Sequence, residues 1–253
     1  MSAPRPNPPA RRATRLALVA GLAAAVVTGL AFVHGAQGRV VPLAAPIAAP
    51  APAFDPPTQG LQTAVLSGGC FWGVQGVFEH VRGVKQVLSG YAGGQGATAN
   101  YDLVSTGTTG HAESVKIVFD PAVISYGQIL RIFFSVATDP TQVGGQYPDE
   151  GSQYRTEVFY MNDGQKAVAT RYIAQLGAAH VFARPIATRV DRYTGFFPAE
   201  TYHQDYLVRH PDQTYIATYD LPKVAALKAL LPAVYRPDPV LALGPGHGGG
   251  RAE

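Results

Sequence analysis

The sequence predicts an α/β (α+β) fold, a two-layer sandwich of helices on a mixed sheet. Apolar residues alternate in some stretches and recur at helical spacing in others, and the two kinds of stretch follow one another irregularly over residues 58–210. The chain has 253 residues, 47% of them hydrophobic, which suffices for one well-cored domain with extensions. No P-loop occurs and no predicted strand leads into a G-x-G-x-x-G fingerprint, which disfavours a doubly wound nucleotide-binding sheet.

Residues 1–36 have the features of an export signal. Arg11, Arg12 and Arg15 precede an uncharged stretch from Leu16 to Val33, followed by small residues that suit a signal peptidase. Because this apolar run is about 18 residues long, the lower limit for spanning a bilayer, an uncleaved membrane anchor is the alternative. In both cases we expect export, with the folded part in the periplasm or attached to the outer face of the inner membrane.

Residues 37–57 form an Ala/Pro tract with six prolines and almost no charge. This composition predicts an extended, semi-rigid linker that holds the folded domain away from a membrane or a cleavage point.

The overall charge excludes one class of function. The chain has 20 basic and 17 acidic residues, but four arginines lie in the first 36 residues, which contain no acid. The remaining chain therefore has 16 basic against 17 acidic residues, and we expect no nucleic-acid-binding face.

The folded domain is expected over residues 58–210. It begins with a strand at 64–66, a helix after Cys70 and a strand at 83–89, and a polar loop then leads to a strand at 114–119. Ser125 is a suitable cap for the next helix, and the long loop at 138–153 is of a length typical of functional segments. Further strands are expected at 154–160 and 181–190, with helices near 164–177 and 199–209. Residues 211–253 are expected to form a C-terminal extension with a helical segment at 223–231 and a disordered Gly/Pro tail from 244 to 250.

Cys70 is the only cysteine of the chain, and it lies next to Phe71 and the only tryptophan, Trp72. The stretch from Gly68 to Gly73 is a strand-to-helix junction, where free backbone N–H groups and the helix dipole favour a reactive thiolate. The alternative is a small buried apolar thiol, which the flanking glycines and the adjacent aromatic pair disfavour. A single cysteine excludes an intrachain disulfide, a CxxC redox pair and a zinc ribbon.

Several polar residues are candidate catalytic residues, but each one considered alone has an ordinary structural explanation as well. Glu113, at the start of the 114–119 strand, is a proton donor if its surroundings raise its pKa, and otherwise a solvated loop acid. Tyr101 and Tyr154 are two of thirteen tyrosines. His111 and His203 raise the possibility of a Cys/His nucleophilic pair with Cys70, which the sequence alone does not decide. The histidines show no metal-ligand spacing, so we expect no metal site.

Five short blocks follow one another through the folded region. They are Gly69-Cys70-Phe71-Trp72-Gly73, Gly90-Tyr91-Ala92-Gly93-Gly94, Gly110-His111-Ala112-Glu113, Gly151-Ser152-Gln153-Tyr154-Arg155 and Tyr202-His203-Gln204-Asp205-Tyr206. Each block alone is a weak signal, but the ordered set, covering about residues 62–210, resembles the A-type peptide methionine sulfoxide reductases. This resemblance implies that the two-layer α/β sandwich is derived from the ferredoxin-like fold.

The resemblance implies a role for each matching residue. Cys70 would attack the sulfur of a methionine S-sulfoxide, protein-bound or free, and become a sulfenic acid in the repair of oxidised proteins. Glu113 would protonate the sulfoxide oxygen and help to activate the thiol, while Tyr101 and Tyr154 would donate hydrogen bonds to that oxygen. The implied substrate-binding residues are Phe71, Trp72, Asp149, His203 and Tyr206.

The chain departs from many family members in having no second cysteine to resolve a sulfenic acid. We therefore expect no bound cofactor and an external thiol reductant, either a thioredoxin-like protein or glutaredoxin with glutathione. We expect the protein to be a monomer.

Two alternatives stay open at this level. One is a cysteine hydrolase or transferase that uses Cys70 with His203 or His111, which would require a histidine within hydrogen-bond reach of the thiol. The other is a non-catalytic envelope protein in which Cys70 is buried packing.

Overall fold

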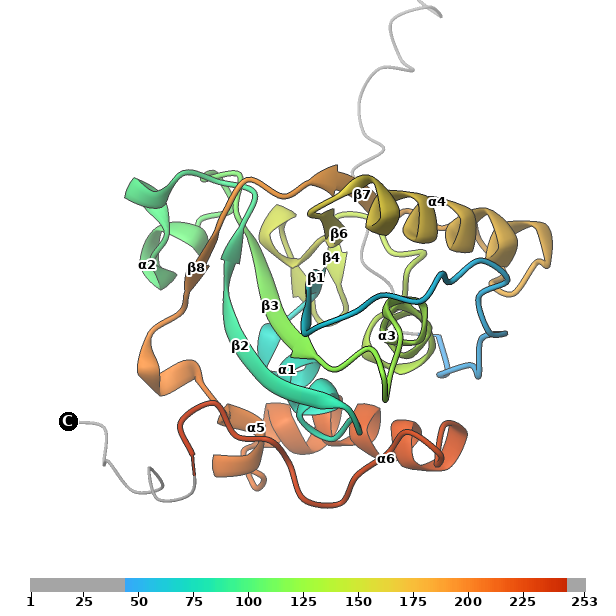
Figure 1. The fold of residues 1–253 in the computed structure, drawn as a ribbon. Coiled ribbons are helices and arrows are strands. Elements are labelled where there is room, and N and C mark those ends of the chain that lie inside the picture. The colour runs from blue at the N-terminus through green and yellow to red at the C-terminus, as the bar shows by residue number, and fades with distance from the viewer. Residues whose placement is uncertain (1–43, 245–253) are drawn as a thin grey trace, which may run out of the picture. The chain divides into compact units, whose positions relative to one another are not determined.

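The computed structural model describes residues 44–244 (Figure 1). A six-stranded sheet has the order β7-β6-β1-β3-β2-β8. Neighbouring strands are antiparallel except for the parallel β6–β7 pair. The strands of this sheet are β1 (Gln62–Gly68), β2 (Val84–Ala92), β3 (Ala112–Phe119), β6 (Thr156–Tyr160), β7 (Arg189–Arg192) and β8 (Phe196–Pro198).

The helices are α1 (Phe71–Glu79), α2 (Tyr101–Val104), α3 (Tyr126–Ile132), α4 (Asp163–Ala178), α5 (Tyr206–Arg209) and α6 (Leu221–Leu230). The order β1-α1-β2-β3-α3-β6 in the chain and β6-β1-β3-β2 in the sheet is the ferredoxin-like split βαβ arrangement. The predicted α/β fold with a mixed sheet is therefore confirmed. In Figure 1 the sheet is strongly curled, with α1, α5 and α6 below it and α3 and α4 to its right.

The sheet buries one face against the helices. Leu66, Val87, Ile117 and Val158 alternate with residues of the other face and belong to one large apolar core that includes Phe78 of α1. On the opposite face Val65, Ala92 and Phe159 form a small buried apolar cluster, against which the partly buried Tyr193 and Phe196 pack.

Most expected elements are present, and two need correction. Ser125 caps α3 in a full capping box with Gln128, as its sequence position predicted. The strand expected at 181–190 is confined to β7, because Pro185 lies in the preceding segment and has no N–H to donate. The helix expected at 199–209 is broken, because Asp205 adopts a left-handed conformation with φ of 56° between the turn Thr201–His203 and α5.

The chain before the sheet does not behave as the expected spacer in its described part. Ala49 is fully buried, and Arg131 of α3 donates to its carbonyl oxygen at 2.7 Å. Tyr172 of α4 donates to the carbonyl of Pro50 at 2.7 Å, and Asp55 accepts from the N–H of Gly127 at 3.0 Å. Residues 44–57 are thus fastened to α3 and α4 by several hydrogen bonds between their backbone and helix side chains.

The C-terminal extension belongs structurally to the same domain. A π-helical turn (Ile216–Asp220) runs into α6, and Ile216 and Leu227 are fully buried. Tyr235 pairs with Val81 in an isolated antiparallel bridge. The predictions for residues 1–36, for 37–43 and for the tail beyond 244 lie outside the described residues. Within residues 44–244 no helix is long and apolar enough to cross a membrane.

Candidate active site

Cys70 occupies the N-cap position of α1, as the strand-to-helix junction predicted. Its side chain is 8% exposed and makes no capping hydrogen bond to the helix. The preceding Gly69 has φ of 93°, and a Cβ there would lie 2.7 Å from Cβ of Gln146. Only glycine therefore allows the strand to turn into α1 with Gln146 packed against it.

The expectation of a low thiol pKa is wrong for the free protein. Burial raises the pKa of Cys70 well above its ordinary value, and the carboxyl groups of Glu113, Asp220 and Asp149 add to the effect. The backbone N–H of Trp72 opposes this increase in pKa without reversing it. Cys70 is thus a neutral thiol near neutral pH.

Glu113 lies on β3 with its carboxyl directed to the start of α1. It is 3% exposed, and its Oε2 accepts the backbone N–H of Phe71 at 2.9 Å. Burial raises the pKa of Glu113 to about 8; Asp149 and Asp220 act in the same direction, and the Phe71 hydrogen bond opposes them. At neutral pH the carboxyl is therefore mostly protonated and able to donate, unlike a solvated loop acid.

Tyr101 and Tyr154 approach this acid from two further segments. Tyr101 is the first residue of α2, and Tyr154 ends the short 3-10 turn Ser152–Tyr154. Burial raises the pKa of both phenols, and the charges of Glu113 and Cys70 raise them further. Both hydroxyls consequently stay protonated at neutral pH and are hydrogen-bond donors near Cys70 and Glu113.

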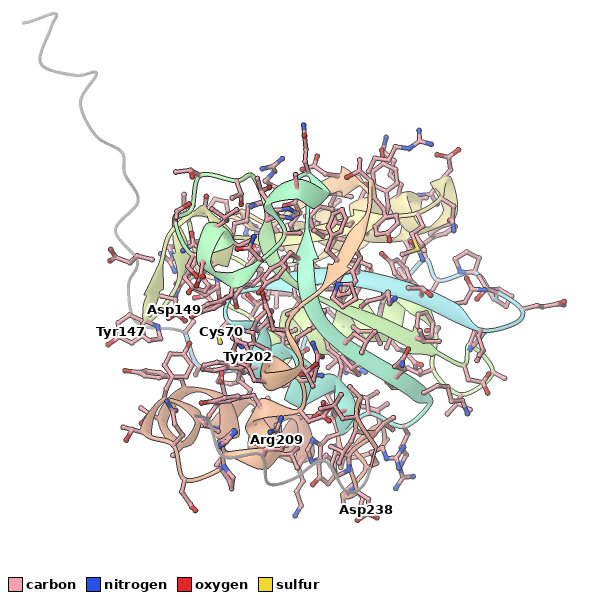
Figure 2. The ribbon with its side chains drawn as sticks, turned by 90° about the vertical axis from the view of Figure 1, so that its left-hand side faces the viewer. Cys70, Tyr147, Asp149, Tyr202, Arg209 and Asp238 are labelled. Carbon is pink, nitrogen blue, oxygen red and sulfur yellow. The ribbon has the colours of Figure 1, made fainter. Side chains whose placement is uncertain are left out.

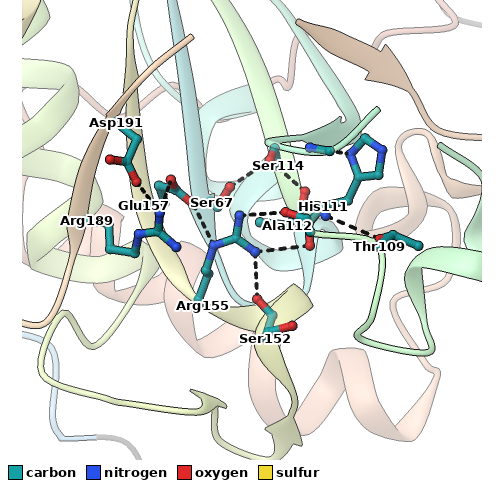
Figure 3. A network of polar contacts seen from close by, with 12 residues as sticks. Ser67, Thr109, His111, Ala112, Ser114, Ser152, Arg155, Glu157, Arg189 and Asp191 are labelled. Carbon is teal, nitrogen blue, oxygen red and sulfur yellow. Dashed lines mark hydrogen bonds and ion pairs between the residues drawn. The ribbon is translucent and has the colours of Figure 1, made fainter. Parts of the chain in front are cut away.

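Arg155 is the centre of a polar network between the loop before β3, the turn Ser152–Tyr154 and Glu157 (Figure 3). Its guanidinium donates to the carbonyls of Gly110 at 3.0 Å, His111 at 3.1 Å and Ser152 at 2.9 Å, and its Nε donates to Glu157 at 2.6 Å. It thereby joins the loop that enters β3 to the turn that carries Tyr154. A planar, five-donor side chain suits this bridging role.

The aromatic residues form a wall beside Cys70. Trp72 stacks on Tyr206, with ring centres 3.9 Å apart and planes inclined by 10°, and its indole N–H donates to Nδ1 of His203 at 3.1 Å. His203 also contacts Phe71 and Tyr101, with ring centres 5.0 and 4.6 Å apart. The structure thus brings together all four predicted pocket residues of α1, α5 and the turn before it.

A second group of polar residues at this site surrounds the predicted Asp149, and its other members, Tyr215, Asp220 and Lys223, were not found from the sequence. Asp149 of β5 (Asp149–Glu150), which pairs with β4 (Gly145–Gln146), accepts a hydrogen bond from the hydroxyl of Tyr215. Lys223 pairs with the fully buried Asp220 at 3.1 Å. Figure 2 views this side of the molecule, with Cys70 and Asp149 labelled. Tyr215, Asp220 and Lys223 lie in the presumed extension, where only the Asp-Leu-Pro start of α6 was a recognisable signal.

Neither histidine is a partner for the thiol. His111 accepts the N–H of Gly94 at Nδ1, 3.3 Å away, and its Nε2 lies 3.0 Å from the carbonyl of Gln95. His203 is engaged by Trp72, and burial lowers its pKa to about 4. No hydrogen bond found within residues 44–244 joins Cys70 to a histidine, which argues against a Cys/His hydrolase. The same residues contain no group of three or more metal-binding side chains.

The comparison with known families decides between the remaining readings. A family model described as peptide methionine sulfoxide reductase matches residues 62–231. The chain belongs to this family, in its A type. The match continues beyond residue 210, the predicted end of the domain, to residue 231. The segment that contains Tyr215, Asp220 and Lys223 is therefore part of the family domain.

Two relatives show how far the similarity extends. The chain is 53% identical over 184 residues to peptide methionine sulfoxide reductase MsrA 2 of Mesorhizobium japonicum, covering 73% of this chain and 94% of the relative. It is 53% identical over 166 residues to MsrA 2 of a Synechocystis strain, covering 66% and 78%.

Solved structures of the same family have a similar fold. The reduced form of Mxr1 from Saccharomyces cerevisiae superposes with a TM-score of 0.54 at 27% identity, covering 62% of this chain and 91% of that one. Methionine sulfoxide reductase A of Corynebacterium diphtheriae gives a TM-score of 0.51 at 27% identity, covering 69% and 87%. The chain is therefore an enzyme that reduces methionine sulfoxide, which excludes the alternative of a non-catalytic envelope protein.

Proposed function

We propose that this peptide methionine sulfoxide reductase uses Cys70 as the nucleophile and Glu113 as the acid for the S epimer of methionine sulfoxide. The hydrogen bond from the N–H of Phe71 to Glu113 supports this assignment most directly, because it places a protonated carboxyl at the helix start that bears the thiol. Tyr101 and Tyr154 are the donors to the sulfoxide oxygen, and Phe71 and Trp72 enclose the methyl group. Asp149, His203 and Tyr206 orient the substrate around them.

The proposed reaction exchanges one oxygen atom. Glu113 gives its proton to the sulfoxide oxygen and accepts the proton of Cys70, so the sulfur becomes a nucleophile only when the substrate is bound. The Cys70 sulfur bonds to the sulfoxide sulfur, and the hydroxyl oxygen then passes to the Cys70 sulfur as the S–O bond and the newly formed S–S bond break. Methionine and a Cys70 sulfenic acid are the products, and Glu113 is again protonated.

The sulfenic acid must be reduced by thiols from outside the chain, because Cys70 is the only cysteine. One external thiol forms a mixed disulfide with Cys70 and releases water, and a second thiol displaces the Cys70 thiolate. We propose a thioredoxin-like protein, or glutaredoxin with glutathione, as the source. A single turnover without reductant should leave one sulfenic acid on Cys70, whereas steady turnover without any added thiol would contradict this step.

We also propose that the enzyme acts as an exported monomer, in the periplasm or on the outer face of the inner membrane. The arginine-flanked apolar segment at 11–33 supports export. Fractionation of cells that express the full chain tests the location. Recovery of all activity in the cytoplasmic fraction would contradict the proposal.

The assay that tests the function uses the separate S and R sulfoxides of a blocked methionine with dithiothreitol as reductant. We expect reduction of the S form and none of the R form by the full chain. Equal reduction of both forms would show that the pocket does not read the configuration at sulfur. Absence of any reduction would contradict the proposed function itself.

A further inference from the structure

We propose that Glu200 is a positioning residue that fixes two side chains of the sulfoxide pocket. It holds Tyr101 directly and holds Trp72 through His203. The inference rests on the roles proposed above for Tyr101 and Trp72. Glu200 precedes the turn Thr201–His203 and lies in none of the catalytic positions.

Three contacts converge on this one carboxylate. Oε1 accepts the backbone N–H of Tyr101 at 3.0 Å, and Oε2 accepts the hydroxyl of Tyr91 at 2.8 Å. Nε2 of His203 lies 3.9 Å from Oε2. The N–H of Tyr101 is one of the free donors at the start of α2, so the carboxylate both satisfies it and fixes where the Tyr101 side chain begins.

The contact with Trp72 depends on the tautomer of His203. An indole N–H can only donate, so Nδ1 of His203, which receives it at 3.1 Å, carries no proton. Since burial keeps His203 neutral, with a pKa of about 4, its proton is on Nε2. That Nε2 atom is buried and makes no hydrogen bond, and its nearest counter-charge is Glu200. The negative carboxylate therefore stabilises the one tautomer that can accept from Trp72.

The charge of Glu200, rather than its shape, is the deciding property. Glu200→Gln keeps an oxygen for the N–H of Tyr101, but it places amide hydrogens opposite the Nε2–H of His203. His203 then moves its proton to Nδ1 or turns away, and in both cases Trp72 loses its acceptor. Glu200→Ala removes the contact with Tyr101 as well.

The test uses the fact that Trp72 is the only tryptophan of the chain, so intrinsic tryptophan fluorescence reports this residue alone. Fluorescence spectra, thermal unfolding and the kinetics of blocked methionine S-sulfoxide are measured for the full chain, Glu200→Gln, Glu200→Ala and His203→Phe. Asp102→Asn is the matched control, because it removes an exposed negative charge from α2 and makes no hydrogen bond described in residues 44–244.

We expect the Trp72 spectrum of Glu200→Gln to shift toward that of His203→Phe, with KM raised about tenfold and kcat changed less. Glu200→Ala should show the same spectral shift and a further loss in kcat of about tenfold, because Tyr101 is also released. Asp102→Asn should match the parent chain in spectrum and kinetics.

Two results would overturn the proposal. One is an unshifted Trp72 spectrum in both Glu200 variants. The other is activity that falls only in proportion to the fraction unfolded, which would make Glu200 a stabilising residue and nothing more. Failure of the parent chain to reduce the sulfoxide contradicts the proposed function instead, and the spectra still decide the role of Glu200.

Discussion

The backbone N–H of Phe71 donates to Oε2 of Glu113 at 2.9 Å, across 42 positions of sequence. This bond joins the first residue of α1, next to Cys70, to the second residue of β3. It uses one oxygen of the carboxyl and leaves the other for a substrate. The chemistry proposed for Cys70 and Glu113 depends on this contact, and the first predictions test these two residues.

Replacing Cys70 by Ser should abolish sulfoxide reduction, because a hydroxyl is a far weaker nucleophile toward sulfur than a thiol. The measurement is dithiothreitol-dependent reduction of methionine S-sulfoxide, with thermal unfolding to show that the variant is folded. Normal turnover in this variant would exclude Cys70 as the nucleophile.

Glu113→Gln should lower kcat about 10² to 10⁴-fold, the range for loss of a general acid, with the domain still folded. In the parent chain activity should decline as pH rises through about 8, because Glu113 loses its proton there. The pH profile of kcat checks this. A Glu113→Gln variant with an unchanged rate and the same alkaline decline would be incompatible with the role of Glu113.

The same carboxyl should make the fold less stable as pH rises. The pKa of Glu113 is raised to about 8 in the folded state, so between about 4.5 and 8 the folded chain holds a proton that the unfolded chain has released. The free energy of unfolding therefore falls over this window by a few kcal/mol. Glu113→Gln should be more stable than the parent chain above pH 8, and denaturant unfolding at pH 5 and pH 9 measures the difference. If the two chains differed in free energy of unfolding by the same amount at pH 5 and pH 9, the raised pKa of Glu113 would be contradicted.

Cys70 should react slowly with iodoacetamide at pH 7, because burial and the neighbouring acids hold it as a thiol. Its alkylation rate should increase with pH beyond the ordinary range of a cysteine. Above pH 8, where Glu113 is ionised, Glu113→Gln should react faster than the parent chain because one negative neighbour is gone. Rapid alkylation at pH 7 would show that the helix dipole outweighs burial after all.

Gly73→Ala should disturb the site by displacing the buried Asp220 and its partner Lys223. A Cβ at this position of α1 would lie 2.0 Å from Oδ1 of the buried Asp220 and 2.9 Å from Nζ of Lys223. We expect a loss of about 1–3 kcal/mol of stability from this overpacking, together with reduced activity because Asp220 is displaced beside Cys70.

The matched control is Gly177→Ala in α4, where a Cβ meets nothing within 4 Å. It should leave activity unchanged and stabilise the chain by up to about 1 kcal/mol, because alanine favours a helix over glycine. Urea unfolding of both variants gives the comparison. If both substitutions changed the free energy of unfolding and the activity equally, the Asp220–Lys223 pair would have moved aside for the new Cβ at little cost.

Much of the fold followed from local pattern. The period of apolar residues predicted β1, α1, β2, β3, α3 and α4, and Ser125 predicted the start of α3, because these signals act over a few neighbouring residues. The strand β8, the helix α2 and the break at Asp205 were missed. These are short elements that depend on partners distant in the chain, such as Tyr91 for Phe197 in the β2–β8 pair.

By itself the sequence determined that Cys70 is the only cysteine and lies at a helix start. It also predicted that an outside thiol restores Cys70 and that Glu113, Tyr101 and Tyr154 are the residues to examine. Tertiary structure alone decided that these side chains meet, that Glu113 is protonated and Cys70 a neutral thiol, and that Tyr215, Asp220 and Glu200 belong to the site. The reason is physical. A pKa and a contact are set by burial and by charges from other segments, which the order of residues along one segment does not contain.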